Sequence, residues 1–522
     1  MSFRLTYATM FDPPEGMHTA FEAALAALRP TLGARHALYL DGADAMRAAA
    51  QRLVSPIDTT LVLGDFALAD AGDVDTAVRA AQAAWPAGRA RPAAGRCALL
   101  RRTAELLQAR VYAIAAALAL EVGKNRMEAL GEAQETVDFF RQYADDFERA
   151  QGYDIALPDD PIAGIVSTNR SVLRPYGVWA VVAPFNFPLA LMGGPTAAAL
   201  VTGNVVVAKG SSYTPWAGRL LADALRDAGV PPGVFQLLHG PAASVGRALT
   251  EHPAVAGITF TGSVSVGRRL LAHSVAGRWP KPCIAEMGGK NPCIVSARAD
   301  LDAAAAGIVR SAYGLSGQKC SALSRLYVDA SVADALIERL RARIAAIAVG
   351  DPTARAHWMG PVNNAAAYAN YADAVQALRA GGATLHAGGE RLTAGDLARG
   401  YYVAPVLAEA PPAHPLWREE LFLPILLLQR VRSRDEAMML ANDSEVGLSA
   451  GFYGGADEVG WFHEHIEAGV TYANRAQGAT TGAWPGYQPF GGWKGSGSTG
   501  KAIASFYYLP LYLREQSRTV VR

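Results

Sequence analysis

The sequence is poor in cysteine and has no excess of either charge. Its four cysteines, Cys97, Cys283, Cys293 and Cys320, include no Cys-x-x-Cys pair, so they predict neither a disulfide scaffold nor a cysteine-rich metal site. The 48 Lys and Arg residues balance 47 Asp and Glu residues, which argues against the basic surface of a nucleic-acid-binding protein. HExxH and P-loop motifs are also missing. The sequence therefore predicts no metal and no nucleic-acid partner.

Long uninterrupted apolar runs are missing as well. The uncharged stretch from Val178 to Val201 contains three prolines and two glycines, which a single membrane-spanning helix would tolerate poorly. It predicts a buried strand, a loop and a buried helix instead. Residues 1–17 carry charges without an apolar core and do not predict a secretory signal. With the scattered cysteines, these features predict a cytoplasmic protein without a membrane segment.

What is present indicates an α/β fold. The 522 residues suffice for two compact domains, and 51 % hydrophobic with 18 % charged residues is typical of a globular protein. Residues 73–150 have helical apolar spacing. Between residues 171 and 286, short β-branched runs alternate with Ala-rich helical stretches, which predicts a Rossmann-type parallel sheet. The predicted strands are Val178–Val182, Val205–Ala208, Val234–Leu237 and Gly257–Phe260.

A second α/β series follows residue 286. It is expected to contain a helix at Leu301–Tyr313, a strand at Arg325–Val328 and a helix at Val332–Val349. In the first series, ligands should bind at the carboxyl ends of the parallel strands. The loops 184–187, 209–212 and 261–267 are therefore expected to line one crevice that holds a nucleotide.

Cys320 lies in a Gly-rich loop with the sequence Gly-Gln-Lys-Cys-Ser-Ala-Leu-Ser-Arg. A lone cysteine is more often a small buried hydrophobe than a nucleophile. Here small and polar neighbours leave the thiol accessible, and Lys319 or a nearby dipole would favour the thiolate. Cys320 is therefore the candidate nucleophile, whereas the other cysteines have apolar or helical contexts.

Three further polar residues end or follow apolar runs. Glu286 either caps a turn or, partly buried in the crevice, serves as a general base with a raised pKa. Asn186 either satisfies a turn or donates to an oxyanion. Lys209 is either solvated or reaches ribose hydroxyls. The Gly/Ser turn that contains Ser263 opens a helix and could face a phosphate, although turns of this composition are frequent.

The order of these segments is more specific than any one of them. Between residues 172 and 496 the chain contains, in this order, Pro-Phe-Asn-Phe-Pro, Lys-Gly-Ser-Ser, Phe-Thr-Gly-Ser, Glu-Met-Gly-Gly-Lys-Asn-Pro, Gly-Gln-Lys-Cys, Glu-Glu-Leu-Phe and Pro-Phe-Gly-Gly. This series resembles the aldehyde dehydrogenase superfamily. The resemblance implies a cofactor-binding domain at 1–152 and 172–286, a catalytic domain at 287–494, and oligomerisation or bridging segments at 153–171 and 495–522. It also implies NAD or NADP as cofactor, an aldehyde substrate, and a homodimer or an assembly of dimers.

In that superfamily a cysteine attacks the aldehyde, an asparagine amide holds the oxyanion, and a glutamate activates the water that releases the acid. The resemblance assigns these roles to Cys320, Asn186 and Glu286. It places Lys209 and Glu420 on the two riboses of the cofactor and Ser263 near the pyrophosphate. The full set of implied cofactor-binding residues is Pro184, Phe185, Lys209, Ser211, Ser212, Gly262, Ser263, Glu420 and Phe422.

Within the superfamily, the cysteine loop, the helical segment at 128–143 and the Tyr-Gln-Pro-Phe-Gly-Gly motif are similar to the glutamate-semialdehyde (1-pyrroline-5-carboxylate) dehydrogenases. The similarity implies a small amino-acid aldehyde as substrate. Its carboxylate would lie on Ser321 and on the backbone of Gly482 and Ala483, with its methylenes between Phe187 and Phe490. A bifunctional enzyme with a preceding proline-oxidising domain is not indicated.

Departures from the family pattern leave three points open. Leu423 replaces a small residue and could alter how Glu420 is held. Ser212 stands where many NAD-specific members have an acid, so that NADP use stays open. The chain beyond Gly497 does not follow the usual ending of the subfamily.

Two alternative functions remain at this stage. One is a dehydrogenase for another carboxylated or aromatic aldehyde, and the other is a catalytically inactive nucleotide-binding protein. A CoA-acylating enzyme is disfavoured because Glu286, the expected hydrolytic base, is present.

Overall fold

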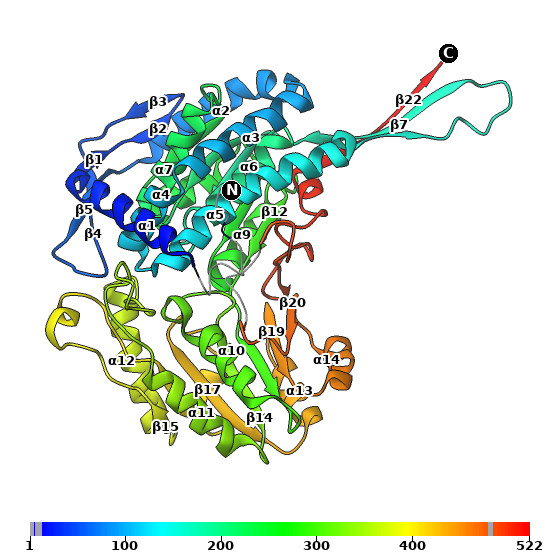
Figure 1. Ribbon diagram of the computed structural model, residues 1–522. Coiled ribbons are helices and arrows are strands. Elements are labelled where there is room, and N and C mark those ends of the chain that lie inside the picture. Colours follow the sequence, from blue (N-terminus) through cyan, green and yellow to red (C-terminus); the bar gives the residue numbers. More distant parts are fainter. Residues whose placement is uncertain (1–4, 6–12, 479–483) are drawn as a thin grey trace.

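Two seven-stranded sheets organise the chain, one in the blue-to-green part of Figure 1 and one in the green-to-orange part. The structure is a computed structural model that describes residue 5, residues 13–478 and residues 484–522. The chain passes from the first sheet to the second between residues 286 and 291. The α/β fold class expected from the sequence is confirmed, while the exact domain limits stay a prediction.

The first sheet has the strand order β12-β11-β8-β9-β10-β2-β3. Strands β8 to β12 run parallel to one another, and β2 and β3 extend the sheet with antiparallel pairs. All residues of β9 and β10 are buried, because helices cover both faces of such a sheet. The strands are β2 (Leu38–Leu40), β3 (Ala43–Ala45), β8 (Val178–Val182), β9 (Val205–Lys209), β10 (Phe235–Leu238), β11 (Val255–Thr261) and β12 (Cys283–Glu286). The four strands predicted from β-branched runs are confirmed to within two residues at each end.

Helices surround this sheet and supply the largest hydrophobic core. Asp70 begins α2 with a capping box, since its side chain accepts from the Asp73 N–H at 2.9 Å while the Asp73 carboxylate accepts from the Asp70 N–H at 3.1 Å. The Asn125 side chain caps α5 by accepting from the Glu128 N–H. The helices are α1 (Glu15–Leu28), α2 (Ala71–Ala90), α3 (Ala93–Ala109), α4 (Val111–Val122), α5 (Arg126–Arg149), α6 (Ala190–Val201), α7 (Pro215–Asp227), α8 (Arg247–Glu251) and α9 (Val264–Ala276).

The second sheet has the order β15-β16-β17-β14-β13-β19-β20. Alternate residues of its strands enter two different cores: Tyr327 and Leu427 pack into one, Leu326 and Leu428 into the other, as the two-residue period of a strand requires. Its strands are β13 (Asn291–Val295), β14 (Leu323–Asp329), β15 (Thr384–Ala387), β16 (Val406–Glu409), β17 (Ile425–Val431), β19 (Ser449–Tyr453) and β20 (Val470–Ala473).

The helices of this second part are α10 (Leu301–Tyr313), α11 (Ala333–Ala345), α12 (Ala365–Ala380), α13 (Arg434–Asn442) and α14 (Val459–His465). The predicted bounds of α10 are confirmed. The helix predicted to reach Val349 ends at Ala345. Val349 instead forms a parallel β-bridge with Met359, a tertiary pairing that the helical spacing did not reveal.

A hairpin projects from the molecule, and the last strand of the chain lies along it (Figure 1). It consists of β6 (Asp154–Leu157) and β7 (Ser167–Pro175), and β22 (Leu513–Val521) pairs with β7 over all nine residues. This hairpin overlaps the segment 153–171 that was expected to serve oligomerisation or bridging, and that role stays a prediction. Two smaller sheets contain β1 (Ala34–His36), β4 (Ala50–Val54), β5 (Val62–Ala67), β18 (Val446–Gly447) and β21 (Trp493–Lys494).

Within the described ranges, no single helix is both long and apolar enough to cross a membrane. Helices α3 and α4 together meet the length and composition criteria, but they are bent by 70° relative to each other.

Candidate active site

The carboxyl ends of four parallel strands meet at one edge of the first sheet. Val182, the last residue of β8, pairs with Lys209 of β9 on one side and with Phe260 of β11 on the other. Thr261 at the end of β11 pairs with Glu286 at the end of β12. The loops predicted to line one crevice therefore begin side by side, and the reason is the register of the sheet.

Cys320 follows a strained backbone segment between α10 and β14. Leu315 and Ser316 have φ values of 49° and 53°, and Gly317 has 71°. This left-handed region is costly for residues with a side chain. The Ser316 hydroxyl donates to the carbonyl of Gly360 at 2.7 Å, which holds the segment from outside. Such local strain persists where the surrounding structure fixes it, and it is common at functional sites.

Asn186 connects the carboxyl edge of the first sheet to the cysteine loop. Its side chain is 3 % exposed, and its Nδ2 donates to the carbonyl of Gln318 at 2.9 Å. An amide nitrogen carries two hydrogens, so this bond leaves a second donor. The Asn186 side chain is thus fixed to the backbone two residues before Cys320. From this position its second N–H can donate to an oxyanion formed on the substrate carbon.

Asn291, at the start of β13, is a site residue that the sequence reasoning did not single out. Its Nδ2 donates to the carbonyls of Cys320 at 2.7 Å and Ala322 at 2.8 Å, and its Oδ1 accepts from the Ser449 N–H at 3.0 Å. The side chain is buried. It therefore fixes the backbone at and after the nucleophile candidate. Its position inside the Gly-Gly-Lys-Asn-Pro motif was the available signal.

The environment of Cys320 differs from one expectation. Of the two groups expected to favour the thiolate, Lys319 or a nearby dipole, Lys319 instead donates its Nζ to Glu128 Oε1 at 2.8 Å in a buried ion pair. Burial, followed by the carboxylates of Glu420 and Glu286, raises the pKa of the Cys320 thiol to about 12. The backbone N–H groups of Ser321 and of Cys320 itself act in the opposite direction. The groups that favour a thiolate here are thus backbone dipoles and not Lys319.

Glu286 ends β12 with a side chain that is 7 % exposed. Its Oε2 has no hydrogen-bond partner among the described residues. Burial raises the pKa of the Glu286 carboxyl well above its usual range, and a backbone N–H of Gly492 opposes this only in part. A buried carboxyl group with an unpaired oxygen and a raised pKa binds a proton strongly once it is ionised. This supports the interpretation of Glu286 as a general base.

Glu420 reaches the same region from the second part of the chain. Its Oε1 accepts from the Gly289 N–H at 3.0 Å, and a Cβ atom added to Gly288 would collide with the carboxylate. Burial of the carboxyl raises the pKa of Glu420 to about 7. Leu423, the departure from the family pattern, is buried in the core of the second sheet. Glu420 nevertheless contacts the turn at Gly288 and Gly289.

Three aromatic rings contact one another at this edge of the first sheet. Phe185 lies edge-to-face with Phe422 at 5.8 Å between ring centroids and with Tyr213 at 6.2 Å. Phe422 has a left-handed backbone with φ of 58°, and Pro184 before Phe185 is half-buried. The structure therefore brings the predicted residues Phe185 and Phe422 together from the two parts of the chain. Tyr213, an exposed residue, was not predicted.

The remaining predicted cofactor residues lie along the same sheet edge. Lys209 is buried, donates to the carbonyl of Gly210 at 2.7 Å, and has a pKa lowered to about 8 by burial. The Ser211 hydroxyl accepts from the Tyr213 N–H, and that of Ser212 donates to the carbonyl of Gly240. Gly262 donates its N–H to the carbonyl of Glu286 at 3.0 Å.

Helix N-termini at this edge differ in their capping. The Glu132 carboxylate accepts from the Leu189 and Ala190 N–H groups at the start of α6, and that of Glu121 accepts from the first turn of α7. In contrast, no side chain caps α9, whose N-cap residue Ser263 is exposed. Of these three helices, α9 is the one whose first N–H groups stay available for an anion.

The predicted substrate residues are only partly described. Phe187 is buried next to Asn186, and Ser321 is buried next to Cys320. Phe490 is half-buried and pairs with Ile503 through two backbone hydrogen bonds. Gly482 and Ala483 lie outside the described residues.

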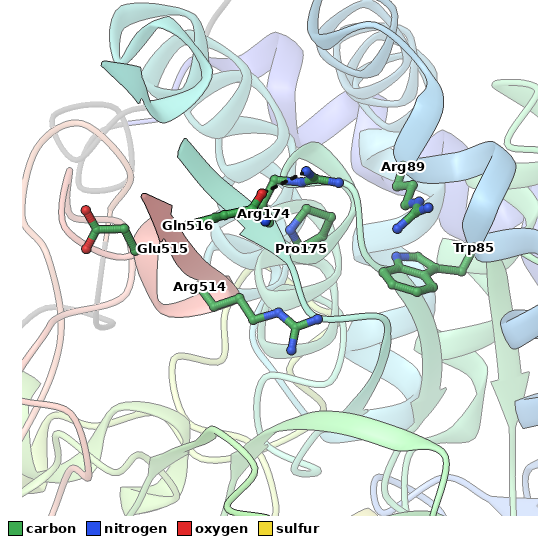
Figure 2. Close-up of a pocket in the computed structure, with 7 residues that line it drawn as sticks. All are labelled: Trp85, Arg89, Arg174, Pro175, Arg514, Glu515 and Gln516. Atoms are coloured by element: carbon green, nitrogen blue, oxygen red, sulfur yellow. Dashed lines mark hydrogen bonds between the residues drawn. The ribbon is translucent and has the colours of Figure 1, made fainter. Parts of the chain in front are cut away.

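A surface pocket lies away from this site, at the base of the projecting hairpin (Figure 2). None of the predicted site residues lines it. Its lining consists of Trp85, Arg89, Arg174, Pro175, Arg514, Glu515 and Gln516.

Comparisons with known proteins agree with this site. The aldehyde dehydrogenase family model matches residues 44–516. The chain is 35 % identical over 507 residues to a 1-pyrroline-5-carboxylate dehydrogenase of Geobacillus thermodenitrificans, covering 96 % of this chain and 95 % of the relative. A Thermus 1-pyrroline-5-carboxylate dehydrogenase with bound NAD superposes with a TM-score of 0.92 at 33 % identity, covering 100 % of this chain and 99 % of that one. An E. coli NADP-dependent enzyme gives a TM-score of 0.86 at 30 % identity, covering 93 % and 98 %.

The chain belongs to the aldehyde dehydrogenase family. It is accordingly an NAD(P)-dependent oxidoreductase that acts on a small-molecule aldehyde.

Proposed function

We propose that this protein oxidises L-glutamate 5-semialdehyde, the open form of 1-pyrroline-5-carboxylate, to glutamate, a step of proline catabolism. The observation that carries the chemistry is the bond from Asn186 Nδ2 to the carbonyl of Gln318, which joins the sheet edge to the cysteine loop. The names of the relatives and the arrangement around Cys320 support the substrate.

In the proposed reaction, the Cys320 thiol releases its proton to water, and the thiolate sulfur bonds to the aldehyde carbon while the carbonyl π electrons move to the oxygen, which becomes an oxyanion. The second Asn186 hydrogen and the backbone N–H of Cys320 donate to that oxygen. After oxidation the carbon remains on Cys320 as a thioester. Glu286 takes a proton from water, the resulting hydroxide attacks the thioester carbon, and the carbon–sulfur bond breaks to release the acid.

NAD or NADP fits the chemistry of the residues at this sheet edge. A bound nicotinamide would supply the acceptor for the hydride that leaves the substrate carbon. Lys209 and Glu420 would hold the two riboses, and the uncapped N-terminus of α9 with Ser263 and Gly262 would hold the pyrophosphate. Ser211, Ser212 and the rings of Phe185 and Phe422 would complete the contacts, with Pro184 shaping the loop.

For the substrate, Ser321 and the Gly482–Ala483 backbone would bind the carboxylate while Phe187 and Phe490 enclose the methylenes. A carboxylate needs several donors and a short chain needs apolar walls. The buried positions of Phe187 and Ser321 beside Asn186 and Cys320 support this assignment.

The decisive experiment is cofactor reduction with glutamate semialdehyde, succinic semialdehyde, benzaldehyde and propionaldehyde, each with NAD and with NADP. A kcat/KM for glutamate semialdehyde well above the others is the expected result. Preference for another carboxylated or aromatic aldehyde would leave the Cys320 chemistry intact and refute the substrate. Cofactor binding without any reduction would instead support an inactive protein.

We propose that the protein is cytoplasmic, and the projecting hairpin supports its assembly as a homodimer or a set of dimers. Ile155, Leu157, Ile162 and Val166 on the hairpin are exposed apolar residues, and β22 is an edge strand, a surface that a second copy would cover. An Ile162→Asp/Val166→Asp variant should have a smaller mass in analytical ultracentrifugation than the unmodified protein. An unchanged mass would refute the role of the hairpin.

A further inference from the structure

Lys124 is a fully buried lysine just after the end of α4, with a side chain that is 0 % exposed. Its Nζ donates to Glu132 Oε2 at 2.6 Å, and the Glu132 side chain is also 0 % exposed. The same Nζ lies 3.4 Å from the centroid of the Phe187 ring. A desolvated ammonium at this distance from an aromatic face is a cation–π contact at the strong end of its range.

The contact is tied to the active-site loop through Glu132. While Oε2 of Glu132 binds Lys124, Oε1 accepts from the Leu189 N–H at 2.8 Å and the Ala190 N–H at 3.2 Å. These N–H groups follow Phe187 by two and three residues. The carboxylate therefore fixes the backbone after Phe187 and the ammonium that faces its ring at the same time.

A neighbouring ion pair, between Glu128 and Lys319, holds a different loop. Glu128, one helical turn before Glu132 on α5, binds Lys319 in the cysteine loop at 2.8 Å. Glu128 and Glu132 thus lie on one face of α5 and hold the cysteine loop and the Phe187 loop, respectively. Lys124 is the member of this group that contacts a predicted substrate wall.

We propose that Lys124 is a positioning residue that sets the Phe187 ring as a wall for the methylenes of the substrate. This inference rests on the proposed function of Phe187. A ring with an ammonium fixed over one face cannot rotate out of contact without leaving a buried charge against an empty space. The opposite face then keeps one orientation, so Lys124 contributes to the selection of chain length without touching the reacting atoms.

The test is a double-mutant cycle of Lys124→Met and Phe187→Leu, with kcat and KM measured for glutamate semialdehyde and for acetaldehyde. We expect each single variant to raise KM for glutamate semialdehyde about tenfold with a kcat change below twofold. The double variant should resemble Phe187→Leu alone, because Lys124 acts through the ring. For Lys124→Met, acetaldehyde, which is too short to contact the wall, should be oxidised with unchanged kcat/KM.

Independent effects, which multiply to about a hundredfold in the double variant, would overturn the proposal. An equal fall of kcat for both aldehydes would do the same, since it indicates a general structural role.

Lys124→Met leaves the Glu132 carboxylate buried without its partner. The cycle is therefore also run on Lys124→Met/Glu132→Gln, in which the introduced amide still offers an oxygen to the α6 N–H groups. Melting temperature and NAD affinity verify folding of each variant.

The proposed substrate and the role of Lys124 fail in distinguishable ways. If the unmodified enzyme does not oxidise glutamate semialdehyde, the substrate proposal falls. The same cycle with the aldehyde of highest kcat/KM then decides on Lys124. Coupling between Lys124 and Phe187 supports the proposal, and additivity refutes it.

Discussion

Replacement of Glu286 by Gln should separate the two halves of the reaction. The substitution keeps the size of the side chain and removes its ability to accept a proton from water. Acylation of Cys320 does not need that base, so the first turnover should proceed. Hydrolysis of the thioester does need it, so the enzyme should stall after one turnover.

The size of the effect follows from the position of the carboxyl. Glu286 is 7 % exposed, and its Oε2 is unpaired among the residues that the structure describes. It is the only acidic residue of β12, so no other carboxylate of this strand can replace it as the base. A positioned general base contributes about 10²- to 10⁴-fold. Steady-state kcat should therefore fall by that factor, about 3–5 kcal/mol in activation free energy.

Stopped-flow absorbance of the reduced cofactor measures both phases. The expected trace for Glu286→Gln is a burst of about one equivalent per Cys320 followed by a slow phase. The matched control is Glu420→Gln, which should weaken cofactor binding without producing a stall. A steady-state rate equal to that of the unmodified enzyme would refute the hydrolytic role of Glu286.

The same substitution has a consequence for stability. Because burial raises the pKa of Glu286 well above its ordinary value of 4.5, the folded state binds more protons than the unfolded state at pH values between the two pKa values. The stability of the unmodified protein therefore falls as the pH rises above about 4.5 toward the folded pKa. In the Glu286→Gln variant this group does not titrate, so the variant lacks this loss of stability with rising pH. Its melting temperature relative to the unmodified protein should rise as the pH increases above about 4.5, and a constant difference would contradict the raised pKa.

Three further substitutions test the other roles. Cys320→Ser should abolish oxidation but not cofactor binding measured by fluorescence titration, with Cys283→Ser, a half-buried cysteine at the start of β12, as the matched active control; retained turnover would exclude Cys320 as nucleophile. Asn186→Ala should lower kcat by roughly a hundredfold or more, whereas an effect on KM alone would indicate a structural role. Ser212→Glu should raise KM for NADP more than KM for NAD, because a carboxylate repels a 2′-phosphate; equal changes would show that Ser212 does not face the ribose.

Much of the architecture could be predicted from local patterns. Strands β8 and β9 are apolar because both faces of a parallel sheet are covered, so they appear in the sequence as continuous β-branched runs. The bounds of β8 and α10 were predicted to the residue. The edge where Lys209 and Glu286 lie then follows from the rule that parallel strands present their carboxyl ends together.

Contacts between distant segments could not be predicted in this manner. Lys319 was one of two candidates for favouring the Cys320 thiolate because it is adjacent in sequence, yet its partner is Glu128, 191 residues away. Asn291 is one polar residue in a Gly-rich motif, and only the fold places its amide on two carbonyls of the cysteine loop. The end of α11 likewise depends on the bridge from Val349 to Met359.

The amino-acid sequence alone determined the fold class, the family and the order of the chemical groups, because apolar periodicity and motif order are properties of neighbouring residues. The tertiary structure decided which charges meet. Whether Lys124 faces Phe187, or Lys319 faces Glu128, depends on burial, since an ammonium removed from water must find a carboxylate or an aromatic face wherever the packed helices provide one.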